Sequence, residues 1–261
     1  MFSEGNKFMK IIAISNQKGG VGKTTTTVNL AASFVNMKKK VLLIDLDPQG
    51  NATSGGGINK SQIQNSIYDV LIGDISLNKI ILKSEESFFD IAPANQDLAG
   101  AEIDLVGIQD REYMLKNAIN VLKKSYDYIL IDCPPTLNLL TVNALVAATA
   151  VLIPMQCEYY ALEGLSDLVN TIKRVKKQLN PKIEIEGLLR TLFDKRNTLA
   201  QQVSDELSSH FGSKVYKTII PRNVRLAEAP SHGKAALFYD KSSKGAKAYL
   251  ALAEEMLRGN A

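Results

Sequence analysis

The chain has 261 residues, 45% of them hydrophobic and 22% charged, which favours one large globular domain over two small ones. The longest apolar run among the first forty residues, Ile11–Ile14, is far shorter than the roughly 20 residues of a membrane-spanning helix, and no apolar signal region is found. Cys133 and Cys157 have no metal-ligand spacing and cannot form a disulfide framework, so a soluble cytoplasmic protein is expected.

The net charge of +4 is unevenly distributed along the chain. Residues 171–261 hold 17 Lys and Arg against 9 Asp and Glu, whereas residues 1–170 hold 14 against 18. Lysines on solvated helix faces would explain this asymmetry as well as a nucleic-acid partner would. The charge alone therefore does not indicate a ligand.

Short apolar runs predict buried strands along the whole chain. They lie at Lys10–Ser15, Val41–Asp45, Phe89–Ala92, Tyr128–Asp132, Ala150–Pro154, Ile185–Leu189 and Val215–Ile220. Stretches with helical spacing of apolar residues alternate with them, at Gly22–Met37, Arg111–Lys124, Leu137–Ala147, Leu162–Leu179, Thr198–Phe211 and Ser243–Leu257. This alternation predicts an α/β fold, a twisted and mostly parallel sheet with helices on both faces, whose ligands bind at the carboxyl ends of the strands.

No repeat and no long linker divides the chain. Residues 1–9 lack periodicity and are expected to form a flexible start, and residues 10–258 one domain. Gly55–Gly57 is the nearest candidate for a linker, but its place after the second strand predicts a mobile loop instead.

A glycine-rich loop follows the first strand and opens the first helix. Its glycines allow successive N–H groups to converge on an anion at the N-terminus of a helix, where the helix dipole favours negative charge. Lys23 would reach the terminal phosphates of a nucleotide, and the Thr24 hydroxyl would ligate Mg²⁺. The predicted nucleotide-binding residues are Lys18, Gly19, Gly20, Val21, Gly22, Lys23, Thr24 and Thr25.

The loop departs from the general pattern G-x-x-x-x-G-K-[ST], because Gln17 stands where that pattern has glycine. Its run Lys18-Gly-Gly-Val-Gly-Lys-Thr-Thr25 resembles the deviant Walker A motif of the ParA/MinD family of dimerising P-loop ATPases. The resemblance implies that Lys18 reaches across a homodimer that sandwiches ATP and acts on the partner's phosphates. A cation there would stabilise the charge that develops during hydrolysis.

Two further segments resemble the switches of that family. Asp45-Leu-Asp47-Pro-Gln-Gly-Asn51 is similar to the first switch, which implies that Asp47 positions the attacking water and that Asp45 is structural. Asp132-Cys-Pro-Pro135 follows an apolar strand, as a Walker B carboxylate does, and resembles the second switch. The resemblance therefore places Asp132 on the Mg²⁺ side of the site, together with Thr24.

The segment Pro221–Ser231 resembles the P-R-x-x-x-x-x-E-A-P stretch of ParA/Soj partition ATPases, which borders the adenine. Pro221 and Asn223 are the implied base contacts, because proline stacks flat and an amide can read an adenine edge. The alternative interpretation is that this segment is a rigid surface turn that does not contact the base. The segment Gln156–Gly164 also resembles the family, and implies a dimer face on which Glu158 is a weaker candidate for touching the partner's nucleotide.

The resemblance implies a role in DNA binding for the positive charge of residues 171–261, because ParA-like dimers bind DNA non-specifically. The candidate basic residues are Arg196, Lys214, Lys217, Arg222, Arg225, Lys241, Lys244 and Lys247. Arg196, Arg222 and Arg225 are predicted first, because each lies beside a loop or a strand end. Contacts of this kind with DNA phosphates carry no sequence readout and weaken with salt.

Taken together, the resemblance implies a cytoplasmic, nucleoid-associated partitioning ATPase that uses ATP and Mg²⁺ and is stimulated by a ParB-like protein. A MinD-like membrane-associated regulator is the main alternative, but Glu254 and Glu255 stand where a membrane-surface helix favours Lys or Arg. An iron–sulfur reductase resembling the nitrogenase iron protein is disfavoured by the sequence around Cys133 and Cys157. A small-molecule synthetase built on the same loop stays open.

Overall fold

The computed structural model describes residues 9–259. The flexible start expected for residues 1–9 therefore lies, apart from Met9, outside the described residues. None of the helices in the described part of the chain combines the length and the apolar character needed to cross a bilayer.

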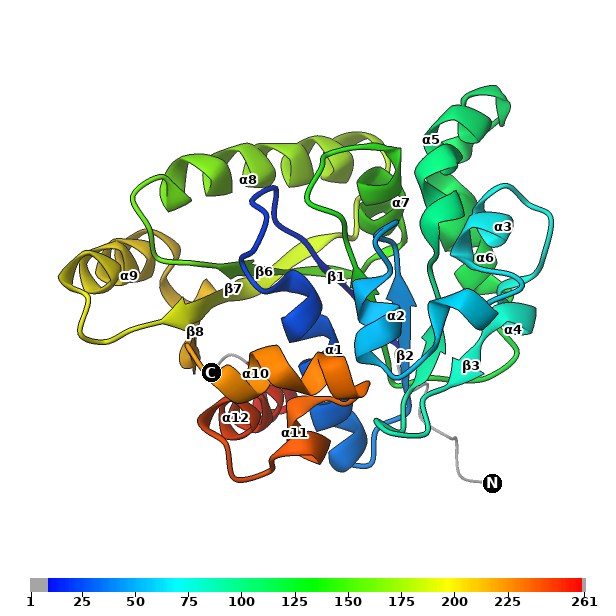
Figure 1. The fold of residues 1–261 in the computed structure, drawn as a ribbon. Coiled ribbons are helices and arrows are strands. Elements are labelled where there is room, and N and C mark those ends of the chain that lie inside the picture. Colours follow the sequence, from blue (N-terminus) through cyan, green and yellow to red (C-terminus); the bar gives the residue numbers. More distant parts are fainter. Residues whose placement is uncertain (1–8, 260–261) are drawn as a thin grey trace, which may run out of the picture.

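Within residues 9–259, eight strands form one sheet in the order β3-β4-β2-β5-β1-β6-β7-β8 (Figure 1). They are β1 (Lys10–Ile14), β2 (Val41–Asp45), β3 (Leu82–Lys83), β4 (Asp90–Ala92), β5 (Tyr128–Asp132), β6 (Ala150–Met155), β7 (Glu184–Phe193) and β8 (Val215–Pro221). All neighbours are parallel except β3 and β4. The seven predicted strands and the mostly parallel sheet are confirmed, and only the two-residue edge strand β3 was not predicted.

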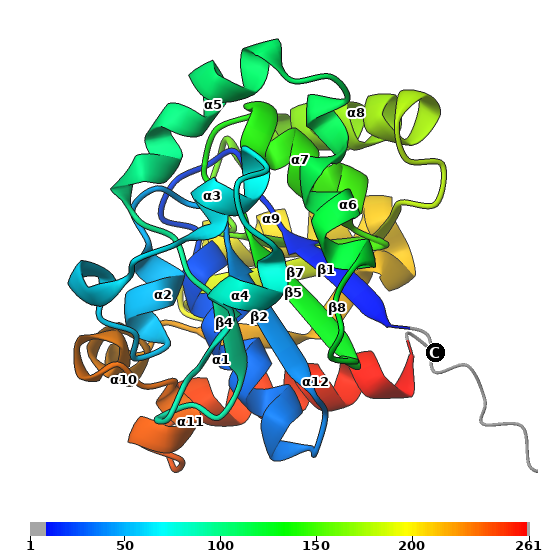
Figure 2. The ribbon, with the colours of Figure 1, turned by 90° about the vertical axis from the view of Figure 1, so that its right-hand side faces the viewer.

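Helices cover both faces of the sheet (Figures 1 and 2). The long ones are α1 (Lys23–Asn36), α8 (Ala161–Gln178), α9 (Thr198–Phe211) and α12 (Lys244–Arg258). Shorter ones are α2 (Asn51–Gly55), α3 (Ile67–Leu71), α4 (Leu77–Ile80), α5 (Ala101–Asp104), α6 (Met114–Asn120), α7 (Leu139–Ala147), α10 (Val224–Glu228) and α11 (Ala236–Tyr239). Single 3₁₀ turns link several of them, among them η6 (Ala229–His232).

Two hydrophobic cores lie on opposite faces of the sheet, because side chains alternate along each strand. In β1, Ile11 and Ala13 join the core beneath α6, α7 and α8, whereas Ile12 and Ile14 join the core beneath α1 and α12. Since both faces are covered, the strands are apolar throughout rather than alternating. This is why short uninterrupted apolar runs revealed them.

The predicted helix Arg111–Lys124 is shorter in the structure, where a 3₁₀ turn leads into α6 and the helix ends at Asn120. The Asn78 amide donates to the Val121 carbonyl at 3.0 Å and accepts from the Lys123 N–H at 2.9 Å. The Asn78 side chain thus forms hydrogen bonds with the backbone groups of Val121 and Lys123 that would otherwise bond within a longer helix.

Gly55–Gly57, predicted as a mobile loop, closes α2 and packs against another segment of the chain. Gly57 has a φ of +84° and lies against Gly233, whose φ is +63°; a Cβ built on Gly57 would lie 2.8 Å from the Gly233 carbonyl oxygen. The Ser84 hydroxyl donates to the Gly56 carbonyl at 2.6 Å. The glycines therefore permit a close contact between two backbones rather than motion.

Candidate functional site

The glycine loop joins the carboxyl end of β1 to the N-terminus of α1. Gly20 and Gly22 have φ angles of +75° and +84°, in the left-handed region that favours glycine. A cavity of about 280 Å³ opens beside the loop, lined by Gly19, Gly20, Gly22, Lys23, Thr24, Thr25, Asp47, Asn51 and Pro135. The structure thus brings the loop together with the two segments interpreted as switches.

Lys23 is only 7% exposed and its ammonium group donates to the Lys18 carbonyl at 3.1 Å. Burial lowers the pKa of Lys23, and the nearby Asp132 carboxylate acts in the opposite direction. Within residues 9–259 this ammonium group bonds to no other atom, so it retains donors for an anion in the cavity.

Asp132 ends β5 and is fully buried beneath the loop. The Thr24 hydroxyl donates to one carboxylate oxygen at 2.7 Å, and the Thr27 hydroxyl donates to the other at 2.9 Å. Burial, with a further contribution from Asp45, raises the pKa of Asp132 to about 8. A hydroxyl and a carboxylate at this position are oxygen donors of the kind that Mg²⁺ prefers, so the residues fit that ion.

The two aspartates of the first switch differ in environment. Asp45 is fully buried, and one of its oxygens accepts from the Thr53 N–H at 2.8 Å and from the Thr53 hydroxyl at 2.7 Å. Burial raises the pKa of Asp45 to about 6, against the effect of the Thr53 bonds. Asp47 instead lines the cavity, where its carboxylate accepts the Gln49 N–H at 2.9 Å. Asp45 is therefore held in the protein interior, whereas Asp47 borders the cavity.

Lys18 lies outside the set of residues that line the cavity. Its side chain is 44% exposed, and its ammonium group lies 2.5 Å from a carboxylate oxygen of Glu158. The contact joins the glycine loop to the loop that follows β6. The Lys18 side chain thus lies at the surface and is paired with Glu158.

The ends of β7 and β8 lie next to the glycine loop. The Thr191 hydroxyl of β7 donates to the Val21 carbonyl at 2.7 Å, and Phe193 pairs with Pro221 of β8. The amide oxygen of Asn223 is buried and has no hydrogen-bond partner within residues 9–259. This oxygen is enclosed beside Gly245 of α12, where a Cβ built on that glycine would lie 3.0 Å from it, so it faces the protein interior.

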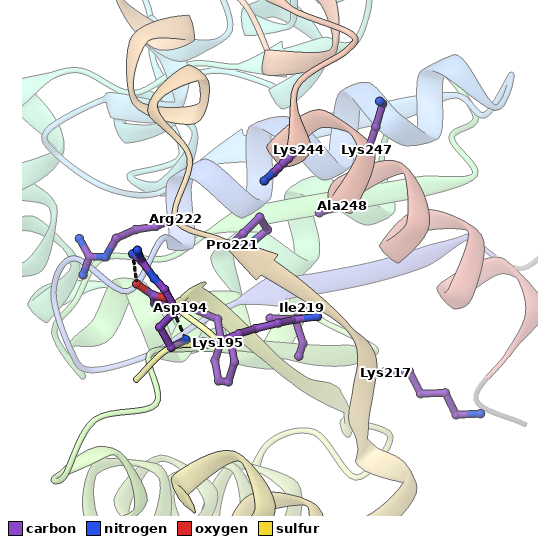
Figure 3. A pocket seen from close by; sticks show the side chains of 11 residues that line it. Asp194, Lys195, Lys217, Ile219, Pro221, Arg222, Lys244, Lys247 and Ala248 are labelled. Atoms are coloured by element: carbon purple, nitrogen blue, oxygen red, sulfur yellow. Dashed lines mark hydrogen bonds and ion pairs between the residues drawn. The ribbon is translucent and has the colours of Figure 1, made fainter. Parts of the chain in front are cut away.

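A larger cavity of about 880 Å³ lies along β8 (Figure 3). Its basic lining comes from β8, α12 and the segment after β7, and consists of Lys195, Arg196, Lys217, Arg222, Lys244 and Lys247. Arg196 is paired with Asp194 at 2.8 Å, but none of the four lysines pairs with a carboxylate of the described residues. We call this cavity the basic groove.

The three predicted DNA-binding arginines do not share one environment. Arg196 and Arg222 line the basic groove, whereas Arg225 does not. Arg225 pairs with Glu228 at 2.7 Å and with Asp240 at 3.3 Å. An arginine held between two carboxylates is less available to a phosphate than an unpaired one.

Comparison with known proteins agrees with the motifs. A family model described as an AAA domain matches residues 9–185. The chain is 56% identical over 247 residues to the sporulation initiation inhibitor protein Soj of Bacillus subtilis, covering 95% of this chain and 98% of that protein. It is 52% identical over 249 residues to the chromosome partitioning protein ParA of Myxococcus xanthus, covering 95% and 88%.

The chain belongs to the ParA/Soj family of P-loop ATPases. Solved structures share the fold of this ParA-type chain. One from Mycobacterium smegmatis, described as cobyrinic acid a,c-diamide synthase with bound ADP and magnesium, has a TM-score of 0.84 and 37% identity, and covers 96% of this chain and 95% of that one. The septum site-determining protein MinD from Pyrococcus horikoshii, complexed with Mg-ADP, has a TM-score of 0.79 and 28% identity, and covers 97% and 99%.

Two features bear on the alternatives to a ParA-type function. The apolar face of α12, which includes Tyr249, Leu252 and Met256, is buried in the core rather than presented at the surface. Burial raises the pKa of the Cys157 thiol to about 11, and that of Cys133 further still. Buried protonated thiols are poor ligands for a cluster shared between subunits.

Several residues that organise this ParA-type site were not predicted. Thr27 bonds Asp132, Thr53 bonds Asp45, and Thr191 holds the glycine loop. Asn16 is buried, and its amide oxygen accepts the Lys18 N–H at 3.0 Å. Asn16 and Thr27 flank the motif Lys18–Thr25, and a polar residue so close to a ligand-binding loop is a signal in the sequence. Thr53 and Thr191 lie far from the motif in the sequence and gave no such signal.

Proposed function

We propose that this protein is an ATP-dependent partitioning ATPase that dimerises around ATP and binds DNA non-specifically in the ATP state. Hydrolysis, stimulated by a ParB-like partner, releases it from the DNA. Its place in the cell would be the cytoplasm, in association with the nucleoid. One observation carries the proposal: Lys23, Thr24, Asp47 and the second switch meet at one cavity, while Lys18 lies outside that cavity at the surface.

In this proposal the glycine loop binds the phosphates of ATP through its backbone N–H groups and Lys23. The Thr24 hydroxyl and Asp132 hold Mg²⁺, which offsets the negative charge of the phosphates. Pro221 and Asn223 contact the base. The phosphate and metal assignments are supported by position, because Lys23 and Thr24 line the cavity and Asp132 bonds Thr24. The base assignment rests on the resemblance of the segment that follows β8, where Pro221 lines the basic groove.

Asp47 positions a water molecule for attack on the terminal phosphorus, and the bond to the bridging oxygen breaks to give ADP and phosphate. Lys18 of a second copy stabilises the charge that develops on the phosphate oxygens. Support for this role comes from the length and exposure of the Lys18 side chain. Hydrolysis would then require two chains, which couples turnover to dimerisation.

The basic groove is the surface that we propose for DNA. Lys217, Lys244 and Lys247 are favoured over Arg225, because their ammonium groups pair with no carboxylate of the described residues. Each ammonium group would release about one counterion from the DNA backbone on binding. Affinity would therefore fall steeply with salt and depend little on sequence.

The experiment that tests this function measures binding of a mixed-sequence duplex with ATP, with ADP and without nucleotide, over a salt series. We expect strong binding with ATP alone, and slow hydrolysis that Lys18→Ala abolishes without loss of nucleotide binding. Equal DNA binding in all three states, or unchanged hydrolysis by Lys18→Ala, would rule the function out. Pelleting with anionic vesicles in the presence of ATP would instead favour a MinD-like role.

The groove is tested by charge removal. Lys247→Ala should weaken ATP-dependent DNA binding roughly uniformly across sequences and reduce the slope of log K against log salt by about 1. Lys177→Ala, an exposed lysine on α8, is the matched control and should change neither quantity. If both variants behave alike, the groove is not the DNA surface.

A further inference from the structure

The turn that follows Asp47 is contacted from outside by a lysine of a later segment. Within the turn, the Gly50 N–H donates to the Asp47 carbonyl at 2.8 Å, and the Gln49 N–H donates to the Asp47 carboxylate at 2.9 Å. The ammonium group of Lys60, 11 positions further along the chain, donates to the Gln49 carbonyl at 2.7 Å. We propose that Lys60 is a positioning residue, which holds this turn where Asp47 borders the cavity beside the glycine loop. This inference rests on the proposed function.

The aliphatic part of Lys60 also packs against the turn. Gly50 has a φ of +60°, and a Cβ built on it would lie 2.7 Å from the Lys60 Cδ and 2.8 Å from the Ala94 carbonyl oxygen. Gly50 therefore lies between Lys60 and the chain after β4, with no room for a side chain. On the inner side, the Ala94 N–H donates to the Thr53 hydroxyl at 2.9 Å, and that hydroxyl donates to Asp45. Buried bonds thus fix the inner side of the turn, and Lys60 closes its outer side.

Lys60 can restrain the turn because its own backbone is anchored. It opens the 3₁₀ turn η1 (Lys60–Gln62), where the Asn59 amide oxygen accepts the N–H and the hydroxyl of Ser61 at 3.1 and 2.8 Å. Among the described residues, the Lys60 ammonium group pairs with no carboxylate, and the Gln49 carbonyl accepts no other hydrogen bond. The contact is therefore a single charge-assisted bond, and its loss would release the outer side of the turn.

The effect of Lys60 should fall on turnover rather than on nucleotide binding. Its side chain lies outside the set of residues that line the cavity, whereas Lys23 and the glycines of the loop belong to that set. One hydrogen bond changes an equilibrium roughly 2- to 12-fold, so its removal should lower the fraction of molecules with Asp47 in place by up to that factor. The rate at saturating ATP should fall accordingly, while the dissociation constant of the nucleotide stays the same.

Steady-state hydrolysis tests this role. Lys60→Met keeps an aliphatic chain against Gly50 but removes the ammonium donor, so kcat should fall roughly 2- to 12-fold while a fluorescent ATP analogue binds as before. Lys60→Arg retains a donor and should restore most of the rate. Lys79→Met is the matched control, because Lys79 is exposed on α4 and its ammonium group makes no bond within the described residues. An unchanged kcat for Lys60→Met, or an equal loss of nucleotide affinity, would overturn the proposal.

Hydrogen–deuterium exchange of the nucleotide-free chain tests the restraint without any hydrolysis. The amides of Gln49 and Gly50 donate within the turn, so they should exchange faster in Lys60→Met by a comparable factor, and Lys79→Met should not change them. The glycine loop is the internal reference, and its exchange should stay the same. Equal exchange of the turn in Lys60→Met and the unmodified chain would sink the proposal. If exchange rises but even the unmodified chain hydrolyses no ATP, the proposed function fails and the contact of Lys60 with the turn is supported.

Discussion

At the scale of single residues, the site is organised by hydroxyl groups placed against buried carboxylates. Asp132 and Asp45 lie on adjacent strands and are both fully buried, a costly arrangement for two like charges. Thr24 and Thr27 donate to Asp132, and Thr53 donates to Asp45. These bonds hold both carboxylates in place. Asp47, in contrast, lines the cavity beside the glycine loop.

Replacing Asp47 with Ala should abolish turnover while nucleotide binding persists. Positioned acid–base groups contribute about 10²- to 10⁴-fold to a rate. Among the described residues, the Asp47 side chain bonds only to the Gln49 N–H, and its backbone bonds to Gly50 and Asp45 persist in the alanine variant. Phosphate release and the binding of a fluorescent ATP analogue are the measurements. Asp74→Ala, an exposed aspartate elsewhere, is the control. Loss of nucleotide binding by Asp47→Ala would contradict the assignment.

The motif residues could be predicted because they are adjacent in the sequence. Gly19 to Thr25 and the aspartates at the ends of β2 and β5 carry recognisable local patterns, and the structure gathers Gly19, Thr24, Thr25, Asp47 and Pro135 at one cavity. The supporting bonds could not be predicted, because Thr53, Thr191 and Glu158 are brought to their partners only by tertiary packing. The roles of Lys18, Asp47, Pro221 and Asn223 stay predictions.

At the scale of elements, β8 is irregular at its centre. Between Leu188 and Arg190 of β7 the register advances from Val215 to Ile219 of β8, so β8 bulges. The buried Arg190 guanidinium donates to the Tyr216 carbonyl at 2.6 Å and to the Ser204 hydroxyl at 2.7 Å. From the other side, Glu255 of α12 accepts the N–H groups of Lys217 and Thr218, at 2.7 and 2.9 Å.

Removing the Glu255 carboxylate should destabilise this region. Glu255→Ala leaves two backbone donors without their charged acceptor, at a cost of about 1–3 kcal/mol in the free energy of unfolding. The neighbouring Glu254 makes only a surface pair with Arg258, so Glu254→Ala should cost less than about 0.5 kcal/mol. Urea unfolding of the two variants checks this. Equal losses would mean that the bonds to β8 contribute nothing.

Strands with continuous apolar runs were predictable, whereas short elements were not. β3 has two residues, Leu82 and Lys83, both exposed, and therefore leaves no hydrophobic pattern. Helix α2 was missed because Pro48 and Gly50 indicated a loop, although Gly50 in fact precedes the first residue of the helix with a φ of +60°. The β8 bulge depends on Arg190 and Glu255 from other elements, so no local pattern in β8 could indicate it.

At the scale of the whole molecule, the segment of α10, η6 and α11 connects the first-switch side of the fold to its basic side. The backbone of Gly233, after η6, packs directly against the backbone of Gly57, after α2. Nearby, Lys234 pairs with Glu86 at 2.9 Å, and the Ala235 N–H donates to Ser87 at 3.1 Å. Residues 224–239, which follow the groove residue Arg222, thus pack against α2 and the chain after it.

A side chain at this junction should destabilise the fold. A Cβ built on Gly233 would lie 2.8 Å from the Gly57 Cα, so Gly233→Ala combines backbone strain with a clash against backbone. Gly73 has a φ of +91°, and among the described residues the only atom within 4 Å of its Cβ would be the flexible Met114 methyl group at 3.9 Å, which makes Gly73→Ala a control for backbone strain without a clash. We expect Gly73→Ala to cost about 1–2 kcal/mol and Gly233→Ala to exceed it by a further 1–3 kcal/mol in thermal or urea unfolding. Similar losses in the two variants would show that the junction can relax.

The two margins of the sheet have a consequence for how copies of this chain can associate. One edge strand, β3, has only two residues. On the other edge strand, β8, the Glu255 carboxylate of the same chain already accepts the N–H groups of Lys217 and Thr218. A strand from another molecule would find few free donors on either side, which disfavours fibres built by extending the sheet. Larger assemblies of this chain would therefore form through side-chain surfaces and would come apart without disturbing the fold.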